Sequence, residues 1–183
     1  MKANEVSQEL LDVVDENDHV VAVKTRGEIH AKGLMHRAVH ILVFNDEQQL
    51  FVQKRSMTKD ECPGLWDTSA AGHVDSGEAY ASCAIRELAE ELGIQVNAPL
   101  QYLFQLSPEL ATGMEHAAVY RYDDNGPFQL QESEIDEGVW ISASDMDQRV
   151  ESGDPTLTSV ICQIWLEFRS HHWNGLSTGH LKK

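Results

Sequence analysis

Apolar residues fall into short runs separated by turn-forming residues along the chain, a pattern typical of β-strands. Two pairs of runs, VVDENDHVVAV and ILVFNDEQQLFV, flank polar turns and predict β-hairpins. The predicted strands cover residues 10–14, 19–24, 37–45, 50–55, 65–71, 94–106, 116–122 and 138–141.

One clear helical segment covers about residues 78–92. It ends at Gly93, a residue suited to the left-handed backbone conformation that closes a helix. Its predicted apolar face consists of Ile85, Leu88, Ala89 and Leu92.

Two further helices are predicted near the C-terminus. A short one starts at position 142 or 144, where serines can cap it, and runs to about 152. A longer one is predicted to have Asp154 as its N-cap and Pro155 as its first residue. Its apolar stripe consists of Leu157, Ile161, Ile164, Trp165 and Phe168.

Many short strands with few helices predict an α+β fold in which a mixed sheet is flanked by helices. At 183 residues with 42% hydrophobic content, the chain can bury one sizeable core. We therefore expect a single domain over residues 1–183, with an N-terminal hairpin extension over 1–35 and a flexible tail over 171–183.

Charge and composition limit the possible binding partners and the cellular location of the protein. The net charge of −16 disfavours nucleic acid, which is bound through many Lys and Arg contacts. The sequence has no run of 18 apolar residues, so no membrane span is expected. Because the N-terminal segment lacks the apolar centre of a signal peptide, we expect a cytoplasmic protein. Cys62, Cys83 and Cys162 form no C-x-x-C pair and are expected to be small buried hydrophobes.

Three glutamates, Glu87, Glu90 and Glu91, stand close together in the first predicted helix. Their spacing of i, i+3 and i+4 places them on one helix face, which we expect to lie opposite the apolar face. A solvated acidic face partly offset by Arg86 explains such a cluster without any function. Carboxylates gathered in this way are also the oxygen ligands that divalent cations prefer.

The surrounding residues favour the second explanation. They fit the pattern G-x5-E-x7-R-E-U-x-E-E-x-G-U, where U is a bulky aliphatic residue. The matching residues are Gly72, Glu78, Arg86, Glu87, Leu88, Glu90, Glu91, Gly93 and Ile94. This string resembles the complete signature of the Nudix hydrolases, and the resemblance extends more loosely over residues 36–170.

The resemblance implies an α/β/α sandwich with a mixed β-sheet, in which the signature forms a loop, a helix and a loop. It implies that Glu87, Glu90 and Glu91 are the catalytic residues and bind Mg²⁺ or Mn²⁺, with the Gly72 carbonyl as a further ligand. The arginine and the first glutamate of the signature are implied to orient the helix and the loop. The implied reaction is the attack of water on a diphosphate linkage, assisted by the cations.

A second resemblance concerns FVQKRSMTKDECPGLWDTSAAGHVDSGE, which is similar to the region before the signature in type I isopentenyl-diphosphate isomerases. Those enzymes share the Nudix fold but move a double bond without hydrolysis. Arg55 and Lys59 match positions that hold the diphosphate, and Trp140 matches an active-site tryptophan. Without the resemblance, the first two are ordinary surface charges and Trp140 is a core aromatic residue.

The same resemblance implies an additional metal site. His36, His73 and Glu115 match its ligands, whereas His30 lies one residue out of register with a further ligand. The resemblance therefore implies a site that is partial in this chain.

The departure from the isomerases decides between the two reactions. Ala71 occupies the position of the isomerase's catalytic cysteine, and an alanine cannot carry a proton. The isomerases also lack part of the carboxylate set, which is complete here. We therefore predict a hydrolase, with an isomerase-like enzyme and a non-catalytic nucleotide-sensing module as alternatives.

The general base is left open. Glu91 is one candidate, and Glu134 and Glu137 are candidates outside the signature, although an acidic surface loop explains the latter two slightly better. The expected partner is a small molecule, either a nucleoside diphosphate derivative or a related organic diphosphate. A homodimer is left open.

Overall fold

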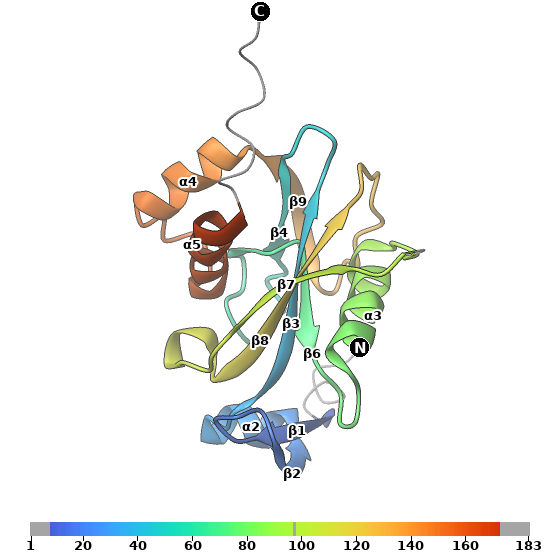
Figure 1. Cartoon of the computed structure of the whole chain (residues 1–183), viewed down its shortest axis with the longest axis vertical. Helices are drawn as coiled ribbons and strands as arrows, with labels where there is room; N and C mark the ends of the chain where they lie inside the picture. Colours follow the sequence, from blue (N-terminus) through green and yellow to red (C-terminus); the bar gives the residue numbers. More distant parts are fainter. Residues whose placement is uncertain (1–7, 97, 173–183) are drawn as a thin grey trace, which may run out of the picture.

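The computed structural model describes residues 8–96 and 98–172. Its centre is a seven-stranded sheet in which β5, β4, β3, β8 and β7 follow one another, β6 pairs with β3, and β9 pairs with β4. The strands are β3 (His36–Phe44), β4 (Leu50–Arg55), β5 (Trp66–Asp67), β6 (Ala70–His73), β7 (Gln101–Leu106), β8 (Glu115–Asp123) and β9 (Ile135–Ile141). Strands β3 and β8 run parallel and the other pairs run antiparallel, so the sheet is mixed (Figure 1).

Strand β3 lies at the centre of the sheet and is covered on both faces. Its odd-numbered residues from Val39 to Val43 pack in one core cluster with α3 (Tyr80–Leu92). Leu42 and Phe44 pack on the other face with α4 (Ala143–Glu151) and α5 (Ser159–His172). Helices therefore flank the sheet on both sides (Figure 1), and the predicted α+β sandwich is confirmed.

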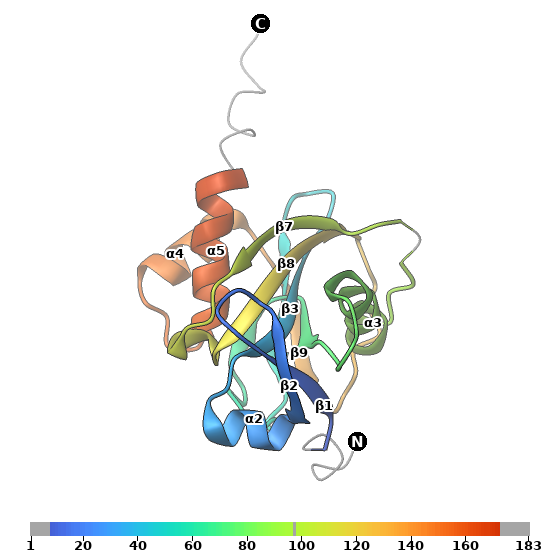
Figure 2. The same ribbon diagram turned by 60° about the horizontal axis from the view of Figure 1, so that its bottom comes forward.

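The N-terminal segment forms the predicted hairpin of β1 (Leu10–Val14) and β2 (Val20–Thr25), a separate two-stranded sheet. It continues into α2 (Arg26–Lys32), a helix that the sequence pattern does not predict. Thr25 caps this helix by accepting a hydrogen bond from the Glu28 N–H at 3.3 Å. Because Ile29 is the one buried aliphatic residue of α2, no apolar periodicity marks it. The hairpin and α2 lie together at one end of the sheet (Figure 2).

Two predicted strands are too long. The segment over 65–71 forms the short strands β5 and β6, separated by Thr68 and Ser69. The Ser69 hydroxyl donates to the Phe51 carbonyl at 2.5 Å and accepts from the Val43 N–H at 2.7 Å. At this position a side chain therefore takes the place of the backbone hydrogen bonds between strands. The segment over 94–106 becomes a strand at Gln101, after Pro99, which has no N–H for a ladder.

The last helix begins at Ser159 rather than at Pro155. Asp154 caps a turn instead, because its carboxylate accepts from the N–H of Thr156 at 2.9 Å and from its hydroxyl at 2.7 Å. The predicted apolar stripe is buried as expected. The helix continues to His172, and the rest of the predicted tail, residues 173–183, lies outside the described residues.

The cysteines differ from the expectation in one case. Cys83 is buried and Cys162 is half-buried, but Cys62 is exposed because it lies in the loop between β4 and β5. Among the helices of the described residues, none has the length and apolar character of a membrane span. The boundary of the N-terminal extension at residue 35 stays a prediction.

Candidate active site

A cavity of about 670 Å³ collects most of the predicted site residues. Those that line it are Gly72, Glu87, Glu90, Glu91, Arg55, Lys59, His73 and Glu115. Two predicted site residues, His36 and Trp140, are not among its lining residues. The cavity therefore brings together the signature glutamates and both predicted phosphate-binding cations.

The glutamates lie on a different face of α3 from the one predicted. Ile85 is 40% exposed, whereas Glu87 and Glu91 are only 8% and 5% exposed. On a helix, positions 87 and 91 lie on one side of the buried Leu88, so they border the apolar stripe rather than oppose it. Glu90 is the exposed member of the set, with 54% of its side chain exposed.

Gly72 leaves the space that Glu87 fills. A Cβ atom at position 72 would lie 2.0 Å from Glu87 Oε1, so no larger residue fits while Glu87 keeps this position. The β6 backbone and the α3 carboxylate are therefore close enough to contact one small ion together.

Glu91 is held by two hydrogen bonds. Its Oε2 accepts from Gln53 Nε2 at 3.0 Å and from the Ala71 N–H at 3.1 Å. Burial raises the pKa of Glu91 to about 7, although the Lys59 charge and the Ala71 N–H act in the opposite direction. Gln53 is not predicted from the sequence, although an amide side chain directly after the apolar run Leu50–Val52 is a signal that could have found it. The structure shows that Gln53 is buried.

Glu87 carries an even larger shift. Burial and the neighbouring charge of Glu91 raise the pKa of Glu87 to about 8. Arg86 Nη1 lies 2.6 Å from Glu87 Oε1 and 3.3 Å from Glu90 Oε2, which offsets part of the repulsion. A divalent cation would remove the rest, so the buried carboxylates fit a cation as ligand set.

Arg86 connects α3 to the loop that follows β6 through hydrogen bonds. Its guanidinium donates to both carboxylate oxygens of Glu78, at 3.2 and 3.0 Å, and to the His73 backbone carbonyl at 3.1 Å. This geometry agrees with the orienting role expected of Arg86 and Glu78.

Arg55 and Lys59 are both engaged with carboxylates or carbonyls of the protein. Arg55 Nη1 lies 3.3 Å from Asp67 Oδ2, and its Nε donates to the Glu61 carbonyl at 3.1 Å. Asp67 is buried, so it fixes the guanidinium in one orientation. Lys59 forms an ion pair with Glu134, which directly precedes β9.

Trp140 does not line the cavity that contains these two cations. Its ring centre is 5.2 Å from that of Phe51 and 5.7 Å from that of Phe128, within the core cluster that includes α3. A direct substrate contact by Trp140 therefore stays a prediction that the position of the ring does not favour.

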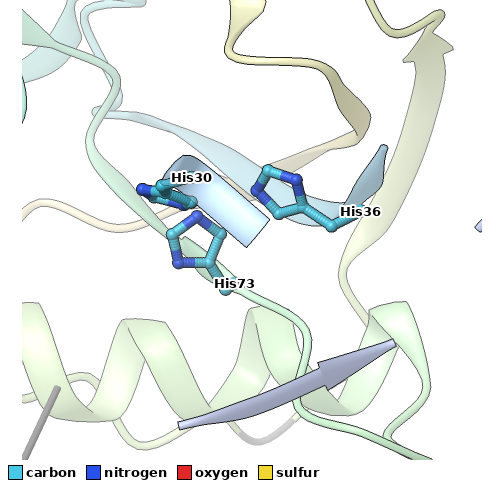
Figure 3. Close-up of side chains that lie close together, drawn as sticks. All are labelled: His30, His36 and His73. Carbon is cyan, nitrogen blue, oxygen red and sulfur yellow. The ribbon is translucent and has the colours of Figure 1, made fainter. Parts of the chain in front are cut away.

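Three imidazoles meet near the signature (Figure 3). They belong to His30 in α2, His36 at the start of β3 and His73 at the end of β6, and their ring centres lie 5.0 to 5.3 Å apart. One ring nitrogen from each lies within 4.8 Å of the others. Glu115 Oε1 lies 3.6 Å from His36 Nε2 and 3.4 Å from His73 Nε2.

His30, which is one residue out of register in the sequence, also belongs to this cluster, and the additional metal site stays a prediction. The helix α2 turns His30 into the cluster, where its Nδ1 lies 3.0 Å from Glu61 Oε1. The Nε2 atoms of His30 and His36 are buried without a hydrogen-bond partner. Burial lowers the pKa of His73 to about 4. Burial acts to raise the pKa of Glu115, but the neighbouring imidazoles hold it well below its usual value. A neutral imidazole beside an ionised carboxylate suits a transition-metal ion.

Arg26 also lines the cavity, although the sequence does not predict it as a site residue. It lines the cavity from α2 although its side chain is only 9% exposed, and its Nη1 lies 3.1 Å from Asp60 Oδ2. Because α2 itself has no apolar periodicity, no sequence signal marks Arg26.

The fold and the cavity define a class: an α+β sandwich with a carboxylate-bearing helix that suits divalent cations and phosphates. The NUDIX domain family matches residues 34–160 of the chain. An uncharacterized Nudix hydrolase of Yersinia pestis is 35% identical over 158 residues, which cover 86% of each chain. The uncharacterized Nudix hydrolase YfcD of Escherichia coli is 32% identical over 161 residues, 88% of each chain. The crystal structure of DR0079 from Deinococcus radiodurans has a TM-score of 0.77 and 26% identity, covering 86% of this chain and 98% of that one.

The chain therefore belongs to the Nudix domain family, and the predicted family is confirmed. It is a Nudix hydrolase, an enzyme of the class that acts on pyrophosphate bonds, mainly in nucleoside diphosphate derivatives, and generally uses divalent cations. Its placement in an isomerase-like branch stays a prediction.

Proposed function

We propose that the chain hydrolyses a diphosphate linkage in a nucleoside diphosphate derivative or a related organic diphosphate, with Mg²⁺ or Mn²⁺ as cofactor. The observation that supports this is the presence of Glu87, Glu90 and Glu91 in one cavity with Arg55 and Lys59. Carboxylates are the ligands that these cations prefer, and the basic side chains suit phosphate oxygens.

The proposed cation ligands are Glu87, Glu90, Glu91 and the Gly72 carbonyl. Two observations support this set: the close approach of Glu87 to Gly72, and the raised pKa values of Glu87 and Glu91. A bound cation would reduce the repulsion between the carboxylates and offset the cost of burying them in ionised form. When bound, the ion supplies positive charge that stabilises the charge developing on the phosphate oxygens.

The protein's own residues have separate tasks in this proposal. Arg55 at the end of β4, held by Asp67, binds a phosphate in a fixed orientation, and Lys59 adds a second positive charge from the loop that follows β4. Gln53 and the Ala71 N–H keep the Glu91 carboxylate turned toward β6.

The alternative reactions can be separated in one assay. Ala71 lines the cavity and offers no proton. Cys62 also lines it, and although this residue is largely exposed, partial desolvation of its thiol raises the thiol pKa. The purified protein with Mg²⁺ would be given a panel of nucleoside diphosphate derivatives and isopentenyl diphosphate. Phosphate release supports the hydrolase, conversion to dimethylallyl diphosphate supports the isomerase, and tight binding without product supports a nucleotide-sensing module. We propose the cytoplasm as the location of the protein.

The histidine cluster supports a second proposed ion site. His36, His73 and Glu115, completed by His30, offer nitrogen and oxygen ligands of the kind that Zn²⁺ or Mn²⁺ prefers. The buried, unpartnered Nε2 atoms of His30 and His36 support an ion there. Elemental analysis of the dialysed wild-type protein should find about one equivalent of a transition metal. The His36→Ala variant should lose this metal but still bind Mg²⁺. Equal transition-metal content in wild type and His36→Ala contradicts this site.

A further inference from the structure

Lys59 and Glu134 form an ion pair at the wall of the cavity. Lys59 lies in the loop between β4 and β5, and Glu134 directly precedes β9. Their side chains are 24% and 25% exposed, so both remain accessible to solvent. A cation proposed to bind phosphate is thus occupied by a carboxylate of the protein itself.

The two loops are joined independently of this ion pair. The Ser56 N–H donates to the Glu134 carbonyl at 2.8 Å, and the Thr58 hydroxyl donates to the Ser133 carbonyl at 3.3 Å. The Lys59 and Glu134 side chains can therefore separate by rotation alone, without moving the backbones apart.

Backbone hydrogen bonds also fix Glu134 relative to the signature helix. The Gln131 N–H donates to the Glu91 carbonyl at 3.0 Å, and the Glu134 N–H donates to the Gln131 carbonyl at 2.9 Å. The charges of Lys59 and Glu134 both act on the Glu91 carboxylate. A Glu134 carboxylate released from Lys59 thus stays beside the proposed cation ligands.

Most other carboxylates that line the cavity are engaged with groups that a substrate does not displace. Glu91 accepts from Gln53 and Ala71, Glu87 pairs with Arg86, Glu61 with His30, and Glu115 with the histidines. Asp67 pairs with Arg55, but it is buried and also accepts from the Thr68 N–H and the Thr158 hydroxyl, which hold it in place. Glu134 differs from all of these, because it is partly exposed and its partner is a lysine for which a substrate phosphate competes directly.

We propose that Lys59 holds Glu134 until a substrate phosphate binds Lys59, and that the freed Glu134 then acts as the general base, an inference that rests on the proposed hydrolase function. The water oxygen forms the new P–O bond while Glu134 takes a proton from that water. The bond from phosphorus to the bridging oxygen breaks, and its electron pair stays on that oxygen in the leaving phosphate. Substrate binding and activation of the base are coupled because one lysine serves both.

Glu134→Gln tests the inference because it removes the ion pair and the base while keeping the size of the side chain. We expect the affinity for methylenediphosphonate, a non-hydrolysable diphosphate, to rise about two- to fivefold in Mg²⁺ by calorimetry, the effect of losing one partly exposed ion pair. We expect kcat to fall about 100-fold or more. In a Lys59→Met background, Glu134→Gln should no longer change this affinity.

The matched control is Glu132→Gln, since Glu132 is an exposed glutamate of the same loop that does not line the cavity. It should keep the wild-type affinity and kcat. Wild-type kcat in Glu134→Gln, or unchanged or weaker diphosphonate binding, overturns this inference and leaves the proposed function intact. A wild-type protein that hydrolyses no diphosphate overturns the proposed function, and with it the assignment of the base.

Discussion

A Cβ atom on Gly72 would lie 2.0 Å from Oε1 of Glu87. The β6 backbone and the α3 carboxylate can share this space because glycine has no side chain. The contact places the first glutamate of the helical cluster against the strand that carries the proposed carbonyl ligand, so Gly72 sets the geometry of the proposed cation site.

Gly72→Ala should therefore weaken cation binding with little effect on folding. The group displaced is the end of a flexible side chain, so the melting temperature should change little, while Mn²⁺ affinity falls about tenfold or more. Gly138→Ala is the matched control, because its Cβ would lie 2.1 Å from the buried Phe51 ring and should lower the melting temperature instead. Wild-type Mn²⁺ affinity in Gly72→Ala would show that the contact is not part of a cation site.

Glu90→Gln and Glu91→Gln should each lower kcat about 100-fold or more at saturating Mg²⁺, because each removes a proposed ligand charge. Melting curves should stay close to wild type, since Glu90 is exposed and glutamine preserves the size of Glu91. Glu151→Gln, an exposed glutamate at the end of α4, is the control. Full activity in either cavity variant removes that residue from the catalytic set.

Stability without metal should fall as the pH rises from about 5 to about 8. The folded-state pKa values of Glu87, about 8, and Glu91, about 7, lie above the ordinary 4.5, so over this range the folded state binds more protons than the unfolded state. His73 acts in the opposite direction below pH 6.5, because its folded pKa is lowered. The difference between wild type and Glu87→Gln in urea unfolding with chelator isolates the carboxylate effect. We expect the free energy of unfolding of wild type to fall relative to that of Glu87→Gln as the pH rises. If this difference stays constant, the raised pKa values of the buried pair Glu87 and Glu91 are wrong.

Arg55→Ala and Lys59→Ala should raise KM for diphosphate substrates about tenfold or more and lower kcat less, because they hold phosphate in the ground and transition states alike. Arg55→Lys should also raise KM, since Asp67 and the Glu61 carbonyl fit a planar guanidinium. Lys54→Ala serves as control, as Lys54 pairs with Glu137 and does not line the cavity. Unchanged KM in both alanine variants would make these residues ordinary surface charges.

The signature helix is predictable because its elements are local. The spacing from Gly72 to Glu91 lies within one loop and one helix, so the sequence alone indicates which carboxylates meet. The burial of Glu87 and Glu91 is not predictable in this way, because the sequence pattern places the apolar face on Ile85 rather than beside the glutamates.

Long-range contacts account for the parts of the site that the sequence does not indicate. Lys59 and Glu134 are 75 positions apart, and the antiparallel pairing of β4 with β9 brings their loops together. The position of His30 in the cluster depends on the helix α2. Because α2 has only one buried aliphatic residue, its sequence shows no apolar periodicity that would predict a helix. Such contacts follow from strand order, which one sequence does not specify.

The most direct test of the central claim is phosphate release from nucleoside diphosphate derivatives, measured with Mg²⁺, with Mn²⁺ and with chelator, beside circular dichroism of the same samples. The proposed function predicts turnover with either ion, its loss in chelator, and an unchanged folded state, because the sheet core is apolar and independent of the cation. Turnover that persists in chelator, or cooperative unfolding when the ions are removed, would contradict a catalytic cation held by Glu87, Glu90 and Glu91.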